Sequence, residues 1–244
     1  MLRAAHLLPL LVVLFATAAC SDAGPAPESD PPAMFDAPAE DATAPVDAPT
    51  IPEDAPTVLF VGDSIGAGLH LAEHQAFPAV LQRRLADDGQ PFHLVNASES
   101  GRTTSQGEAV VRWNTARGAR PIDLVVIELG GNDGLRGIDL ELVESNLRAM
   151  VAAAREAGAR VLLLGVRMSP DLGAYADGFD AIYARLADEL EVALVPHFLD
   201  GVGGVPEMNL ADGLHPTAQG HERLADNVEA GLRAALDAVS AAAR

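Results

Sequence analysis

Short apolar segments alternate with longer segments of helical periodicity along most of this chain. The apolar segments span Thr57–Val61, Phe92–Asn96, Ile122–Leu129, Arg160–Val166 and Val192–Val195. The run Ile122–Leu129 is apolar at nearly every position, as expected of a strand that is covered on both faces of its sheet. Strands that alternate with helices form parallel sheets with helices on both faces. The pattern therefore predicts a three-layer α/β/α domain around a five-stranded parallel sheet.

One predicted helix follows each predicted strand. The helices span Phe77–Leu85, Ser105–Arg117, Leu140–Glu156, Phe179–Leu190 and Pro216 to about Val239. The first and the third of them show apolar residues at helical spacing. Ligands of such sheets bind beyond the carboxyl ends of the strands. The residues that directly follow the strands are therefore the first candidates for a functional site.

The N-terminal segment predicts export. A basic start precedes an apolar run, residues 7–15, and then small residues. That run is shorter than the ~20 residues that a membrane-spanning helix needs. We interpret residues 1–19 as a signal peptide of the lipoprotein type, cleaved before Cys20, whose thiol would carry a lipid. An ordinary signal peptide with an incidental cysteine is the alternative, and Thr17 favours it because lipoprotein signals usually have Leu there.

Residues 20–56 are predicted to be a disordered linker, and residues 57–244 the folded domain. The linker is rich in Pro, Ala, Asp and Glu, and it shows no apolar period. Such a segment buries too little apolar surface to offset chain entropy, and its like charges extend it. The chain contains a single cysteine, so an intramolecular disulfide is impossible.

The charge balance disfavours two classes of partner. The chain has 35 acidic and 16 basic residues, a net charge of −19. Nucleic acids and anionic membrane surfaces are both bound through clustered cations. We therefore expect no nucleic-acid partner, and we expect membrane association only through a lipid on Cys20.

The first predicted strand ends in the sequence Gly62-Asp63-Ser64. A serine in the turn after a strand can point its hydroxyl beyond the end of the sheet. Free N–H groups of such a turn can stabilise negative charge. Ser64 is therefore a candidate nucleophile. The alternative is a serine that caps the next helix.

Candidate hydrogen-bond donors follow two other strands. Gly101 lies in the loop after the second strand, and the sequence Gly130-Gly131-Asn132-Asp133 follows the third. The latter can also be a plain turn, since Gly, Asn and Asp all favour turns. Because parallel strands end at one edge of a sheet, we expect a hydroxyl, a backbone N–H and a side-chain amide to meet there.

Asp212 and His215 form the last candidate pair, in the sequence DGLHP. An Asp three residues before a His can accept the Nδ1–H of the imidazole and leave Nε2 free as a base. Pro216 is expected in the first turn of the last helix. The six other histidines have no comparable setting. His197 and His221, with His215 and Asp212, suggest a metal site as an alternative, but paired ligands at zinc spacing are missing.

Together these segments resemble the four conserved blocks of the SGNH (GDSL) hydrolases. The blocks are Gly62-Asp63-Ser64, Gly101, Gly131-Asn132-Asp133 and Asp212-x-x-His215, in that order. Residues 126–137 (VIELGGNDGLRG) are similar to the third block of one subgroup, the multifunctional periplasmic thioesterases, lysophospholipases and arylesterases. Residues 96–101 and 167–170 are similar to that subgroup too. Ile65 replaces the usual Leu, a conservative change, and the likeness covers nearly all of Val58–Val228.

The resemblance implies a flavodoxin-like fold and a serine esterase that hydrolyses acyl esters or thioesters through an acyl-enzyme, without cofactor or metal. It implies Ser64 as nucleophile, His215 as general base and then acid, and Asp212 as the residue that orients His215. It further implies that the N–H groups of Ser64 and Gly101 and the amide of Asn132 bind the oxyanion.

The expected substrate is a small acyl ester or a lysophospholipid-like molecule, and the expected enzyme is a monomeric, exported lipoprotein. The loops 166–175 and 202–210 are candidate walls of the acyl pocket. A carbohydrate O-acetylesterase is the main alternative, although an aromatic content of 4% disfavours a sugar-stacking surface. A non-catalytic surface lipoprotein with the same fold is the other alternative.

Overall fold

The computed structural model describes residues 49–242 of the 244-residue chain. The predicted signal peptide 1–19, Cys20 and the predicted linker up to residue 48 lie outside the described residues. Within residues 49–242, no helix combines the length and the apolar character of a membrane span.

A parallel sheet of five strands forms the centre of the domain. The strands are β1 (Thr57–Gly62), β2 (His93–Asn96), β3 (Leu124–Glu128), β4 (Arg160–Leu164) and β5 (Ala193–Val195). Their order is β2-β1-β3-β4-β5, and all four neighbouring pairs are parallel. This is the predicted flavodoxin-like arrangement, and it confirms the fold class. The chain reverses its direction of winding between β1 and β3, the point at which such sheets bind ligands.

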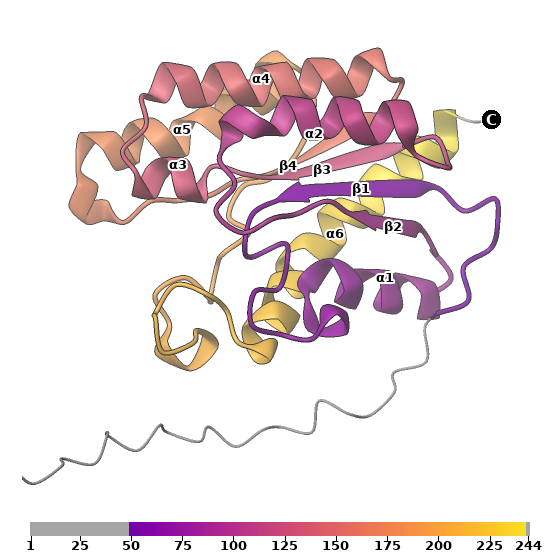
Figure 1. The fold of residues 1–244 in the computed structure, drawn as a ribbon, viewed down its shortest axis with the longest axis horizontal. Helices are drawn as coiled ribbons and strands as arrows, with labels where there is room; N and C mark the ends of the chain where they lie inside the picture. The colour runs from indigo at the N-terminus through magenta and orange to yellow at the C-terminus, as the bar shows by residue number, and fades with distance from the viewer. Residues whose placement is uncertain (1–48, 243–244) are drawn as a thin grey trace, which may run out of the picture. The chain divides into compact units, whose positions relative to one another are not determined.

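Helices cover both faces of the sheet. They are α1 (Phe77–Asp87), α2 (Thr104–Arg117), α3 (Gly131–Leu135), α4 (Leu140–Glu156), α5 (Ala174–Glu189) and α6 (Ala218–Ala242). Figure 1 shows α1 and α6 below the sheet and α2, α3, α4 and α5 above it. All residues of β1 and β3 are buried between these two layers, which explains their continuous apolar runs.

Apolar faces with helical spacing attach the helices to the sheet. On α6 the buried residues Leu224, Val228, Leu232 and Leu236 recur every fourth position. Each fully buried side chain of this size contributes ~1.5–3 kcal/mol relative to an exposed one. Helices α2 and α4 approach closely because Gly107 has no side chain, and a Cβ there would lie 2.0 Å from Sδ of Met150.

The helix α5 begins five residues before the predicted start at Phe179. Gly178 lies in its first half, and glycine disfavours helix by ~1 kcal/mol relative to alanine. The glycine is tolerated because Leu140 packs against it, and a Cβ at this position would lie 2.5 Å from Cδ1 of Leu140. Three short 3-10 helices, Glu73–Gln75, Pro170–Leu172 and Pro206–Met208, were also not predicted.

Candidate active site

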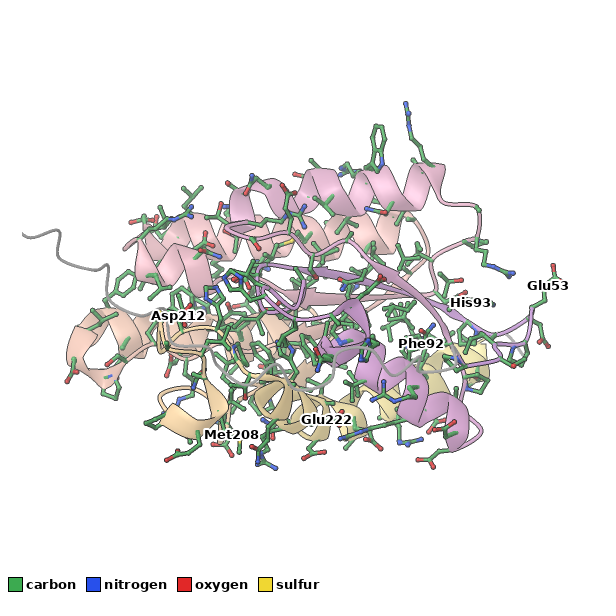
Figure 2. The ribbon with its side chains drawn as sticks, turned by 60° about the horizontal axis from the view of Figure 1, so that its bottom comes forward. Glu53, Phe92, His93, Met208, Asp212 and Glu222 are labelled. Carbon is green, nitrogen blue, oxygen red and sulfur yellow. The ribbon has the colours of Figure 1, made fainter. Side chains whose placement is uncertain are left out.

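A cavity of about 830 Å³ lies at the carboxyl ends of the strands. Its lining residues come from the segments that follow all five strands: 63–69, 100–101, 131–135, 165–170 and 197–215. Figure 2 shows Asp212 at the opposite end of the domain from His93, the first residue of β2. The cavity is therefore at the edge where the sequence predicted the site.

Ser64, His215 and Asp212 form a continuous hydrogen-bonded chain at this cavity. Nε2 of His215 lies 3.0 Å from Oγ of Ser64. Nδ1 of the same ring lies 2.7 Å from Oδ2 of Asp212. With Nδ1–H donated to the carboxylate, Nε2 is the acceptor for the serine hydroxyl.

The turn before His215 fixes both of its partners. Oδ1 of Asp212 accepts the backbone N–H groups of Leu214, at 2.9 Å, and of His215, at 3.0 Å. These bonds, first the backbone N–H of His215 and then its ring, hold the pKa of the Asp212 carboxyl well below its usual range. Gly213 has φ +68°, a left-handed conformation that glycine adopts without strain. The short spacing Asp-Gly-x-His thus builds the pair locally.

The sequence predicted Pro216 in the first turn of the last helix, but Pro216 lies before that helix. Helix α6 begins at Ala218, and Pro216 forms an antiparallel bridge with Asn209. The hydroxyl of Thr217 accepts the backbone N–H of Gly220 at 3.1 Å, as an N-cap residue does. The cap at Thr217 therefore determines where the helix starts.

Ser64 occupies a series of turns between β1 and α1. Oδ1 of Asp63 accepts the N–H of Ile65 at 2.9 Å, and the carbonyl of Ser64 accepts the N–H of Leu69 at 3.0 Å. The residue before α1 is Ala76, so the helix-capping interpretation of Ser64 is wrong. Its hydroxyl faces His215 instead.

The three expected oxyanion donors lie around the same cavity. Ser64, Gly101 and Asn132 all line it. Gly101 has φ +80°, which explains why glycine occupies this position. Within residues 49–242, the backbone N–H groups of Ser64 and Gly101 donate to no protein acceptor. Both N–H groups are therefore available to a ligand.

Asn132 lies in the short helix α3 rather than in a plain turn. Its Nδ2 atom donates to Oδ2 of Asp63 and to the carbonyl of Arg102, both at 3.1 Å. These bonds fix the amide at the rim of the cavity. The amide can bind an oxyanion only by sharing or exchanging one of them.

A buried acidic residue beneath the turn that contains Ser64 was missed by sequence reasoning. Glu128 is 2% exposed, and its Oε2 accepts the N–H groups of Asp63 at 3.2 Å and Gly66 at 3.0 Å. Burial, followed by the nearby Asp63 carboxyl, raises the pKa of Glu128 well above its usual value. Burial also raises the pKa of Asp63. The signal was present in the sequence, because Glu128 is the one charged residue of β3.

Three of the remaining histidines have settings that the sequence did not indicate. The ring of His70 lies 6.3 Å from that of His215, and His70 has φ +69°. His197 lines the cavity. His221 is buried, its Nδ1 accepts the N–H of Phe77 at 3.1 Å, and burial lowers its pKa to about 4. Among residues 49–242, no three His, Cys, Asp or Glu side chains lie close enough to hold a metal.

Both loops proposed as walls contribute to the cavity. Residues 166–170 line it, whereas the second half of the loop 166–175 lies in a 3-10 helix and the start of α5. The opposite wall is longer than the proposed 202–210, because it begins at His197. Its exposed rim includes Leu214, and Leu135 lies at the end of α3.

The chain matches known proteins over most of the domain. The model of the GDSL-like lipase/acylhydrolase family matches residues 60–223. The esterase TesA of Pseudomonas aeruginosa is 47% identical over 172 residues, which cover 70% of this chain and 85% of TesA. Thioesterase 1/protease 1/lysophospholipase L1 of Escherichia coli K12 is 36% identical over 174 residues, covering 69% and 79% of the two chains.

Solved structures agree with these matches. The crystal structure of TesA superposes with a TM-score of 0.70 at 47% identity, and the match covers 73% of this chain and 99% of that one. The chain therefore belongs to the GDSL-like lipase/acylhydrolase family, in the subgroup that the sequence resemblance indicated, and it is a serine esterase.

Proposed function

We propose that Ser64 is the nucleophile of this esterase, His215 its general base and acid, and Asp212 the residue that orients His215. One observation carries the proposal: the unbroken chain of contacts of 3.0 Å and 2.7 Å from Oγ of Ser64 through the imidazole to the Asp212 carboxylate. The carboxylate holds the ring in the tautomer that can accept the serine proton.

The reaction proceeds in two halves. Oγ of Ser64 attacks the acyl carbonyl while Nε2 of His215 takes its proton, and the tetrahedral oxyanion forms. His215 then protonates the leaving alcohol or thiol, which departs and leaves an acyl-enzyme. Water, deprotonated by His215, attacks the acyl-enzyme in the same way and releases the acid.

The N–H groups of Ser64 and Gly101 and the amide of Asn132 bind the oxyanion. The first two are supported by their lack of protein acceptors within residues 49–242. Loss of a single donor in such a site costs about 10²–10³ in kcat. No metal or cofactor is needed for any of these steps.

The substrate is a small acyl ester or a lysophospholipid-like molecule, with thioesters as a second group. The cavity volume of about 830 Å³ is in the range of small-molecule binding sites, and apolar side chains of Val166, Met168 and Leu199 line it. The names of the two relatives, which include esterase, thioesterase and lysophospholipase, agree with this choice. Within the described residues the lining contains no Phe, Tyr or Trp, which disfavours a sugar-stacking O-acetylesterase.

The proposal also includes export, a lipid on Cys20, a linker of residues 20–56 and a monomeric domain of residues 57–244. The pattern of residues 1–20 supports export and the lipid. Incorporation of labelled palmitate that is lost in Cys20→Ser tests the lipid. Equal labelling of the two proteins would contradict it.

A panel of esters tests the enzymatic proposal. We expect hydrolysis of p-nitrophenyl esters from acetyl to palmitoyl, of lysophospholipid and of acyl-CoA, and little release of acetate from acetylated xylan. Ser64→Ala should abolish hydrolysis, whereas Ser105→Ala, an exposed serine of α2, should not change it. Turnover confined to acetylated xylan would favour the carbohydrate esterase, and an inert wild type would favour a binding protein.

A further inference from the structure

A buried arginine lies among the three proposed oxyanion donors. Arg102 directly follows Gly101, and its side chain is 8% exposed. Its guanidinium donates to the carbonyl of Gly62 at 3.3 Å, to the carbonyl of Ala97, and to the carboxylate of Glu99 at 2.6 Å. A buried guanidinium is tolerated only with such partners. Since the Glu99 side chain is 75% exposed, the two backbone carbonyls are the buried part of this set.

The acceptors of the guanidinium belong to two separate segments. Gly62 is the last residue of β1 and stands two positions before Ser64. Ala97 and Glu99 lie in the loop that leads from β2 to Gly101. The side chain of Arg102 therefore ties the Gly101 loop to the start of the nucleophile turn.

The main chain of Arg102 adds a third segment. Its carbonyl accepts Nδ2 of Asn132 at 3.1 Å. Its N–H donates to the carbonyl of Glu99 at 3.2 Å and closes the turn that contains Gly101. Arg102 is thus connected to all three donors. Ser64 stands two residues after Gly62, Gly101 directly precedes Arg102, and the Asn132 amide donates to the Arg102 carbonyl.

We propose that Arg102 is a positioning residue that sets the relative placement of the oxyanion donors. The inference rests on the proposed function of Ser64. A rigid planar guanidinium presents five N–H donors in a fixed fork, whereas the three donors of a lysine lie on one nitrogen at the end of a flexible chain. Donors that are displaced by as little as 1 Å lose much of their effect on the transition state.

Backbone hydrogen bonds attach the Gly101 loop to β1 independently of the Arg102 side chain. The N–H of Ala97 donates to the carbonyl of Phe60 at 2.9 Å, and the N–H of Glu99 to that of Gly62 at 3.2 Å. These bonds hold the loop on β1 without the guanidinium. Removal of the Arg102 side chain should therefore shift the donors and leave the domain folded.

Reaction with a fluorophosphonate, followed by intact mass on the full chain, distinguishes the two roles. In this reaction Oγ of Ser64 forms a bond to phosphorus, the P–F bond breaks, and the proton passes to His215. The phosphoryl oxygen takes the place of the oxyanion, so the rate constant reports the donors. The final labelled fraction reports how many molecules are folded.

We expect Arg102→Met to lower the rate constant by about 10- to 100-fold while its final labelled fraction equals that of the wild type. Arg102→Lys keeps the charge with fewer contacts and should give an intermediate rate constant. Arg112→Met is the matched control, because Arg112 is a surface residue of α2 that pairs with Glu108 of α2 and Glu156 of α4, and this variant should react like the wild type.

Two results for Arg102→Met would overturn the inference. One is a rate constant within twofold of the wild type, and the other is a reduced labelled fraction that reacts at the wild-type rate. If Arg102→Met yields no folded protein, the measurement on Arg102→Lys decides, and a wild-type rate there has the same meaning. A wild type that does not react at Ser64 would contradict the proposed function instead, so the two failures are distinguishable.

Discussion

Nε2 of His215 lies 3.0 Å from Oγ of Ser64, although the two residues are 151 positions apart in the chain. Ser64 follows the end of β1, and His215 lies shortly before α6. The parallel sheet brings them together, because the carboxyl ends of all five strands lie at the same edge of the sheet. The distance fits proton transfer in the resting protein.

The carboxylate of Asp212 is expected to support turnover by holding His215 in the tautomer that carries its proton on Nδ1. Asp212→Asn keeps the size of the side chain but can present an amide N–H, instead of a lone pair, to Nδ1. We expect kcat for p-nitrophenyl butyrate to fall by about 10²-fold or more, with KM within a few-fold. Asp237→Asn, an exposed change on α6, should have no effect. Wild-type kcat in Asp212→Asn would remove the orienting role.

Asn132 is expected to act on turnover more than on stability. Asn132→Ala removes the amide from the rim and frees the carbonyl of Arg102 and Oδ2 of Asp63, a residue that lines the cavity. We expect kcat to fall by about 10²–10³. The melting temperature should change by only a few degrees. A large loss of melting temperature without a change in kcat would assign Asn132 to the fold alone.

The buried acid Glu128 should make stability depend on pH. Its folded-state pKa is raised, so above the usual value of 4.5 the unfolded chain releases a proton that the folded chain retains. The contribution of Glu128 to the free energy of unfolding therefore falls as pH rises from that value. Glu128→Gln removes this titration, and its Oε1 can accept the same two N–H groups. We expect the melting temperature of the variant to rise relative to the wild type between pH 4.5 and pH 8.

Glu144 supplies the opposite control. Its pKa is lowered, chiefly by its bond with Arg185, so its ionised form stabilises the fold above the usual pKa. Glu144→Gln should therefore lose stability relative to the wild type as pH rises through the acidic range. A difference in melting temperature between wild type and Glu128→Gln that is the same at all pH values would contradict a retained proton on Glu128.

His221 should contribute to unfolding in acid. Burial lowers its pKa to about 4, so between pH 6.5 and pH 4 the unfolded chain binds a proton that the folded chain does not. The contribution of His221 to stability is complete above pH 6.5 and is lost as pH decreases through this window, which costs about 3 kcal/mol. In His221→Asn, Oδ1 replaces Nδ1 as acceptor for Phe77.

Urea unfolding at several pH values measures this contribution. His221→Asn should be less stable at pH 7 because a buried ring is lost. Its free energy of unfolding should nevertheless vary less between pH 6.5 and pH 4 than that of the wild type. Equal slopes in both proteins would show that other groups cause the acid sensitivity.

The sequence predicted the sheet well because parallel strands covered on both faces are nearly continuous apolar runs. Ile122–Leu129 contains all of β3, and Thr57–Val61 lacks only the last residue of β1. The start of α5 was predicted less well, since a contact with Leu140 compensates for Gly178. Tertiary packing of this kind leaves no local pattern in the sequence.

For the site, the sequence predicted the residues that follow strands, and the structure brings Ser64, His215 and Asp212 together. It did not indicate what lies beneath them. The role of Arg102 depends on carbonyls of Gly62 and Ala97, and backbone acceptors have no sequence signature. The residues of each turn could therefore be predicted from the sequence, whereas the contacts between the turns could not.

Identification of the modified residue tests the central claim most directly. The wild type is treated with a fluorophosphonate, digested and analysed by tandem mass spectrometry, alongside Ser64→Ala and His215→Ala. We predict one adduct, on Ser64, that forms at least about 100-fold more slowly in His215→Ala and is absent from Ser64→Ala. An adduct on another residue, together with full ester hydrolysis by Ser64→Ala, would contradict the assignment of Ser64 as the nucleophile.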